Sequence, residues 1–145
     1  MPSNAKGFSV LEFMIAVSMI AILASVSATV FVYFGNRSQF IDSLQEAMLI
    51  AGSSAQKSMA LSSRCKTGTV NFTDQDSQYF SQAVFAKNGN ACTATLTYKN
   101  YSSKTGIRAE LRNKTITLKF EFTPKAGITM SCSTSVSSEY TSGKC

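Results

Sequence analysis

The side chains of this chain that could do chemistry unaided are four cysteines, Cys65, Cys92, Cys132 and Cys145, and a few scattered carboxylates. The cysteines show no C-x-x-C spacing, and the chain contains no histidine. Structural zinc sites and thioredoxin-type redox motifs depend on such partners, so neither is predicted. Outside the reducing cytosol, four cysteines would form two disulfides, with three connectivities open.

The carboxylates could in principle form the pair that glycoside hydrolysis needs. The candidates outside the N-terminal segment are Asp74, Asp76, Glu110, Glu121 and Glu139. None of them stands beside a recognisable catalytic constellation, and the lack of histidine excludes Ser-His and Cys-His nucleophile pairs. We therefore expect no enzymatic activity, no metal and no cofactor.

The composition predicts one folded domain rather than a disordered chain. The 145 residues are 44% apolar and 15% charged, which is too apolar for intrinsic disorder. Fourteen Lys and Arg against eight Asp and Glu give a formal charge of +6. This balance permits binding to DNA or to anionic surfaces, although the basic residues are scattered along the chain without interleaved aromatic residues.

Glu12 is the only charged residue in an apolar segment over residues 8–34, which holds 21 apolar residues and five Ser or Thr. As a helix these 27 residues would reach about 40 Å, more than the ~30 Å hydrocarbon core of a bilayer. An Asp at the centre of a membrane helix costs about 2.5–3.5 kcal/mol, and a Glu should cost a similar amount. The segment predicts a membrane span whose one carboxylate requires a partner.

Two ordinary explanations of this segment remain alternatives. A cleaved secretory signal would end near Val26-Ser27-Ala28 and leave Thr29 at the new N-terminus. Its apolar region is usually about 7–15 residues, shorter than the run found here. An uncleaved signal anchor fits the length but leaves Glu12 unexplained.

The residues Lys6-Gly7-Phe8-Ser9-Val10-Leu11-Glu12-Phe13-Met14 resemble the class III leader junction of type IV pilins. The resemblance extends over about the first fifty residues. It implies that a prepilin peptidase removes the leader, residues 1–7, after Gly7 and that the new N-terminal Phe8 is N-methylated. It also implies a single-pass precursor in the inner membrane, which an assembly platform adds to an extracellular helical filament.

In this interpretation Phe8 and Glu12 set the register between subunits. Cleavage would create an ammonium on Phe8, one helical turn from Glu12. An unpaired charge in a low-dielectric bundle costs several kcal/mol, so Glu12 of one subunit is expected to neutralise Phe8 of its neighbour. Ala21 and Thr29 stand where family members have a helix-loosening Gly and a Pro.

The remainder, residues 35–145, is expected to form the pilin head, giving an α+β fold with a long N-terminal helix packed on a four-stranded antiparallel sheet. The apolar segment 8–34 and the apolar residues at intervals of three and four from Phe40 to Met59 predict one helix from about Ser9 to Ser62, with its amphipathic half at 36–62. A surface loop is predicted over 63–91 and a sheet over 92–132. Alternation predicts strands at residues 93–98, 107–112, 115–122 and 127–131, with a short turn at Asn113-Lys114.

Of the three connectivities, Cys65 with Cys92 and Cys132 with Cys145 is preferred, because the first pair would clamp the long loop and the second would close the loop 132–145. This closed C-terminal loop also matches the pilin pattern. The leading hypothesis is a pilus subunit (fimbrium) acting in adhesion, motility or DNA uptake. The alternatives are a pseudopilin of a type II secretion system and a signal-anchored exported binding domain.

Overall fold

The computed structural model describes residues 9–62, 65, 67–89, 91–100, 106–123, 127–141 and 143–145, without the side chains of residues 55–62 and 122. The chain divides into two compact units, Met1–Gly35 and Asn36–Cys145. The long helix α1, Val10–Ser62, begins in the first unit and ends in the second. The proposed leader junction at Gly7 and Phe8 lies outside the described residues.

The predicted long helix is confirmed to within one residue at its start. Its backbone is helical through Ala21 and Thr29, the positions where the pilin pattern has helix-weakening residues. Neither alanine nor threonine removes a backbone donor, so the hydrogen-bonded ladder continues through both positions.

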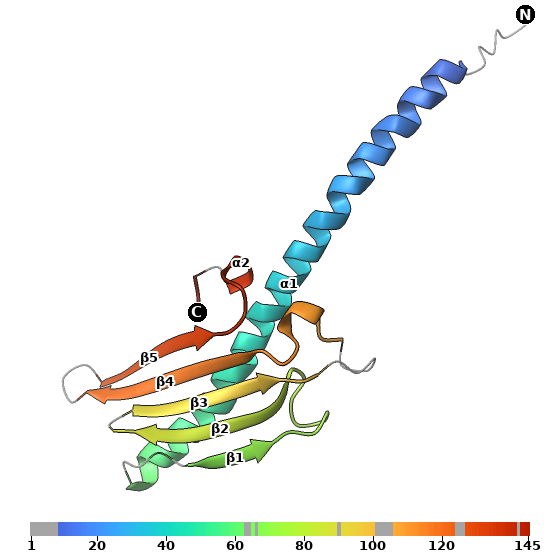
Figure 1. Ribbon diagram of the computed structural model, residues 1–145. Coiled ribbons are helices and arrows are strands. Elements are labelled where there is room, and N and C mark those ends of the chain that lie inside the picture. The colour runs from blue at the N-terminus through green and yellow to red at the C-terminus, as the bar shows by residue number, and fades with distance from the viewer. Residues whose placement is uncertain are drawn as a thin grey trace, which may run out of the picture. The chain divides into compact units, whose positions relative to one another are not determined.

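The second unit contains one antiparallel sheet in the order β1-β2-β3-β4-β5, which is also the order along the chain (Figure 1). The strands are β1 Gly68–Asn71, β2 Phe80–Asn88, β3 Ala91–Tyr98, β4 Thr115–Thr123 and β5 Gly127–Thr134. A 3-10 helix, η1 Ala109–Leu111, precedes β4, and a short helix, α2 Ser138–Thr141, follows β5. The α+β class is confirmed, but the sheet has five strands rather than four.

Two of the predicted elements are wrong. The segment 63–91 is not a structureless loop, because it contains β1 and β2. The segment 107–112 is not a strand, because Ile107 and Leu111 are both buried while Ala109 and Glu110 are exposed on η1. Asn113, at a left-handed φ of 56°, belongs to the turn between η1 and β4 rather than to a hairpin.

A bulge explains why the sequence pattern did not predict β2. Phe80 pairs with Tyr98, but the next pair joins Gln82 to Thr97, so the register shifts by one residue. Phe80 and Ala83 are consequently both fully buried at a spacing of three. Period-two alternation fails at such an insertion. β1, with four residues, is too short to give a clear pattern.

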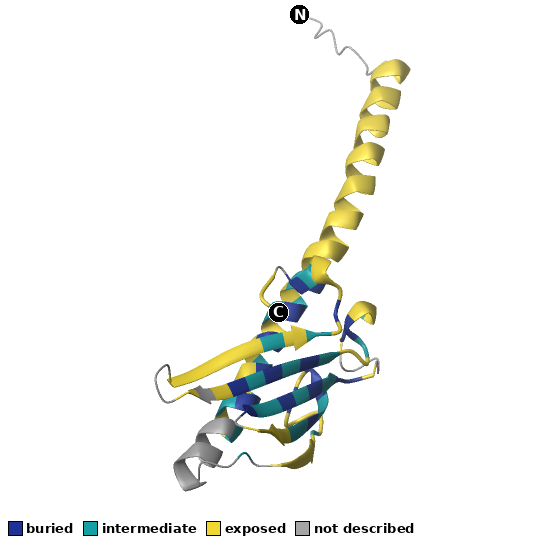
Figure 2. Cartoon of the chain, turned by 60° about the vertical axis from the view of Figure 1, so that its left-hand side comes forward, coloured by how far each residue is buried: buried dark blue, intermediate teal, exposed yellow. Residues whose placement is uncertain are grey.

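The core of the second unit lies between α1 and one face of the sheet. Phe40, Leu44, Ala47 and Ala51 form the buried stripe of α1 and pack in one cluster with the sheet residues. The sheet's helix-facing side is formed by alternate residues, among them Ala94, Leu96 and Tyr98 on β3 and Ile116, Leu118 and Phe120 on β4. Figure 2 shows the resulting alternation of buried and half-buried positions along the central strands.

Candidate functional site

The first unit exposes an apolar helix that has no core of its own. Every residue from Val10 to Phe34 is exposed, including Leu11 at 68%, Leu23 at 68% and Phe31 at 73% (Figure 2). By length and composition α1 could cross a membrane. A run of large apolar side chains in water is unfavourable by about 25 cal/mol per Å², so this surface requires lipid or other apolar helices.

Four hydroxyl groups within this helix donate to its own backbone. Ser18 Oγ donates to the Met14 carbonyl at 2.7 Å, and Ser27 Oγ donates to the Leu23 carbonyl at 2.8 Å. Ser25 and Thr29 donate in the same way to the carbonyls of Ile22 and Val26. Such i−3 and i−4 bonds satisfy hydroxyl donors without water, which is what hydrocarbon or a dry helix bundle demands.

Glu12 occupies the first turn of α1 as part of a capping box. The backbone N–H of Ser9 donates to Glu12 Oε2 at 3.1 Å, and the backbone N–H of Leu11 donates to Ser9 Oγ at 3.2 Å. Each bond satisfies an amide that has no partner within the helix. The carboxylate also lies at the N-terminal, positive end of the helix dipole.

Sequence reasoning had treated Glu12 only as an intermolecular charge, although the signal for the cap was present. Ser9-Val10-Leu11-Glu12 is the S-x-x-E pattern that precedes an apolar run in a capping box. The cap holds the carboxylate at a defined place on the helix. It does not neutralise the charge, because the bond that the carboxylate accepts comes from the neutral backbone N–H of Ser9.

The carboxylates of the second unit hold the segment between β1 and β2 in place. Lys99, which is 7% exposed, binds Asp74 Oδ1 at 2.7 Å and the Ser77 carbonyl at 2.6 Å. Glu46 of α1 accepts bonds from the Ser77 hydroxyl and from the Gln78 backbone N–H. These contacts tie the segment to both α1 and the end of β3.

Two other carboxylates considered for catalysis also have local partners. Asp76 accepts bonds from the backbone and hydroxyl of Thr73, and the hydroxyl bond, the larger cause, lowers the pKa of Asp76. Glu121 pairs with Lys119 on β4. Within the described part of the chain, no three His, Cys, Asp or Glu side chains gather where they could hold a metal ion.

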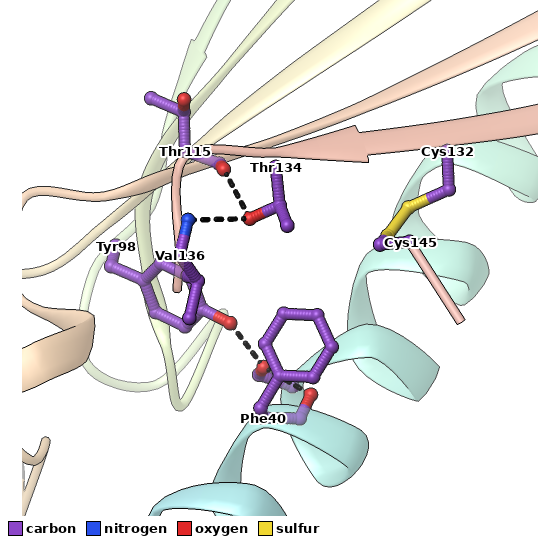
Figure 3. The surroundings of a disulfide bond; sticks show 8 residues. Phe40, Tyr98, Thr115, Cys132, Thr134, Val136 and Cys145 are labelled. Atoms are coloured by element: carbon purple, nitrogen blue, oxygen red, sulfur yellow. Dashed lines mark hydrogen bonds between the residues drawn. A yellow bond between two sulfur atoms is a disulfide. The ribbon is translucent and has the colours of Figure 1, made fainter. Parts of the chain in front are cut away.

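The two disulfides join Cys65 to Cys92 and Cys132 to Cys145, the connectivity that was preferred from the sequence. Cys132–Cys145 closes the C-terminal loop onto β5, as Figure 3 shows. Inside this loop Val136 is buried, and its N–H donates to Thr134 Oγ1 at 3.2 Å. The Thr134 hydroxyl in turn donates to the Thr115 carbonyl at 2.8 Å. The loop is therefore a packed part of the second unit.

A buried pair next to this loop links α1 to the sheet. The hydroxyls of Ser43 on α1 and Tyr98 on β3 are hydrogen-bonded, and Ser43 Oγ also bonds the Phe40 carbonyl at 2.7 Å (Figure 3). Burial raises the pKa of the Tyr98 phenol, and the bond from Ser43 opposes this only in part. The neutral phenol therefore belongs to the folded state.

Comparison with known proteins adds no assignment: no protein-family model matches the chain, and no curated protein sequence is significantly similar to it.

Proposed function

We propose that this chain is the structural subunit of a type IV pilus filament, inserted first in the inner membrane as a single-pass precursor. Prepilin peptidase cuts after Gly7, Phe8 becomes the methylated N-terminus, and the assembly platform adds the subunit to an extracellular filament that serves adhesion, motility or DNA uptake. The observation that carries the proposal is the exposed apolar stretch Val10–Phe34 of α1, with a single carboxylate in its first turn.

Lipid alone does not account for both features of this helix. A cap and a helix dipole contribute roughly 1–2 kcal/mol together, whereas a carboxylate costs about 2.5–3.5 kcal/mol at the centre of a membrane helix and somewhat less near its end. The remaining cost favours a cationic partner for Glu12. In a bundle of identical helices the Phe8 ammonium of a neighbouring copy would supply it, and the bundle would cover the apolar surface.

A second candidate function has one observation in its favour. The capping box gives Glu12 a role within a single chain. This would suit a signal-anchored exported binding domain that needs no neighbouring copy. The two disulfides and the packed C-terminal loop suit the head of a surface filament better than a type II secretion pseudopilin.

Two substitutions separate the charge of Glu12 from its cap. Glu12→Gln removes the charge but keeps a side-chain acceptor that also serves in capping boxes. Ser9→Ala removes the hydroxyl of the cap but keeps the charge. We expect Glu12→Gln to reduce sheared filament yield about tenfold or more, as a loss above about 1.4 kcal/mol implies, with normal amounts of subunit in the membrane. Ser9→Ala should assemble nearly normally.

The absence of any filament containing this chain, with the unmodified subunit present in the membrane, would favour the anchored domain. Normal filament yield from Glu12→Gln would show that assembly does not need the charge of Glu12. A loss from Ser9→Ala with normal yield from Glu12→Gln would assign Glu12 to helix capping alone.

A further inference from the structure

Two charged residues, Glu12 and Arg37, bound the uncharged stretch of α1. The stretch between them is residues 13–36, 24 in all, and it lies within one uninterrupted helix. At ~1.5 Å per residue it measures about 36 Å, whereas a bilayer has a hydrocarbon core of ~30 Å and a total thickness of about 40–45 Å. If Glu12 lies at one face of a bilayer, Arg37 therefore reaches the headgroup layer of the other face.

Aromatic side chains mark the same boundary. Tyr33 and Phe34 come shortly before Arg37, and their rings meet edge to face with centroids 5.6 Å apart. Tyr33 is 38% exposed and Phe34 is 59% exposed. Tyrosine concentrates at membrane–water interfaces, because its ring is apolar and its hydroxyl is polar. The residues just before Arg37 thus have the composition of such an interface.

The second unit brings two further arginines to the beginning of its part of α1. The Gln39 side chain donates to the Gly106 carbonyl at 3.0 Å, and its oxygen accepts a bond from the Arg108 backbone N–H at 2.8 Å. Arg112 Nε donates to the Ile107 carbonyl at 3.3 Å. These bonds hold both arginines beside the first turns of the helix in this unit.

Positive charge predominates around these turns. Arg37, Arg108 and Arg112, which we call the arginine cluster, carry three positive charges against the one negative charge of Glu110 on η1. Asp42 lies more than one helical turn beyond Arg37 along α1. The three arginines are half-buried, so none of them is enclosed in the core. Guanidinium groups match the geometry of phosphate with paired hydrogen bonds.

We propose that the arginine cluster binds the phosphate groups of anionic phospholipids at the surface of the membrane that holds the first unit. The sign of the charge selects this partner, and Arg37 reaches it because it follows the exposed apolar stretch by only three residues. A cationic residue near an anionic membrane surface contributes about fivefold to binding. The contact holds this end of the second unit against the membrane. The inference rests on the membrane insertion included in the proposed function, but not on the filament.

Hydrogen exchange of the full-length chain in lipid nanodiscs tests this contact. Nanodiscs of zwitterionic phosphatidylcholine are compared with nanodiscs that contain anionic phosphatidylglycerol. We expect exchange in residues 106–112 to be about fivefold slower in the anionic nanodiscs, because bound lipid opposes the opening of this segment. Exchange in residues 84–88 of β2 should be equal in both. High salt should remove the difference, since at 1 M the screening length is about 3 Å.

Paired substitutions assign the effect to the arginine cluster. Arg37→Gln with Arg108→Gln should abolish the slower exchange. The matched control, Lys87→Gln with Lys119→Gln, removes the same charge from β2 and β4 and should keep it. Mapping of the two disulfides in each variant checks the fold.

Three results would overturn the inference: equal exchange of residues 106–112 in the two lipids, slower exchange that survives the double arginine substitution, or the same slowing by free inorganic phosphate in phosphatidylcholine nanodiscs. The last result would mean that the arginine cluster takes soluble phosphate rather than lipid. A chain that enters neither nanodisc would overturn this inference and the pilus proposal together. The absence of filaments from cells would overturn the pilus proposal alone.

Discussion

The side chain of Glu12 caps the start of α1 and also carries the charge for which a neighbouring copy is the proposed partner. The cap places its carboxylate in the first turn of α1, at the positive end of the helix dipole. Both effects are local and could have been predicted from Ser9 and Glu12 alone. Whether a neighbouring copy neutralises the charge depends on contacts that a single chain does not contain, so that part stays a prediction.

Tyr98 provides a pH-dependent prediction. Its folded-state pKa is raised above the unfolded value of about 10, mainly by burial, so its stabilising contribution is complete below pH 10 and is lost as the pH rises further. We expect the unfolding free energy to fall above pH 10 by up to about 1.4 kcal/mol per pH unit from this group. Tyr98→Phe should be less stable by about 1 kcal/mol at pH 7 but should lose this share of the slope.

Urea unfolding in detergent, followed by circular dichroism between pH 7 and 11, would measure both effects. Tyr79 serves as an internal control, because burial also raises its pKa, although less strongly than that of Tyr98. The Tyr98→Phe variant keeps Tyr79, so it keeps the share of the alkaline slope that Tyr79 contributes. An unchanged alkaline slope in Tyr98→Phe would show that Tyr98 ionisation does not limit stability.

At the level of elements, the sequence predicted the helices and strands whose apolar residues recur at regular intervals. The second half of α1, β3 and β4 follow the predicted apolar spacing closely, and β5 extends three residues beyond its predicted end. β2 was missed because its bulge places Phe80 and Ala83 on one face at a spacing of three. Ile107 and Leu111 fit the alternation of a strand in the sequence. In the structure Leu111 is buried at the end of η1, and Ile107 is buried just before this helix.

The Cys132–Cys145 disulfide should stabilise the second unit through its C-terminal loop. A loop of this length corresponds to about 3 kcal/mol in chain-entropy estimates. We expect the double substitution Cys132→Ser with Cys145→Ser to lower the unfolding free energy by about that amount, measured by urea unfolding. Hydrogen exchange at the Val136 amide should accelerate more than exchange in β3. Unchanged protection of Val136 would mean that its packing alone holds the loop.

At the scale of the whole molecule, the two units make different demands. The second unit buries its own core and closes it with two disulfides. The first unit leaves every residue from Val10 to Phe34 exposed. Composition predicted this division, because residues 8–34 are almost entirely apolar whereas the remainder resembles an ordinary soluble domain. The apolar surface of the first unit can be buried only by lipid or by other chains.

The mass and N-terminal sequence of the subunit in sheared surface filaments test the central claim most directly. The account predicts filaments built from a chain that begins at Phe8, carries an N-methyl group and lacks residues 1–7. A product that begins at Met1 or at Thr29, in cells that bear no filament containing this chain, would contradict it.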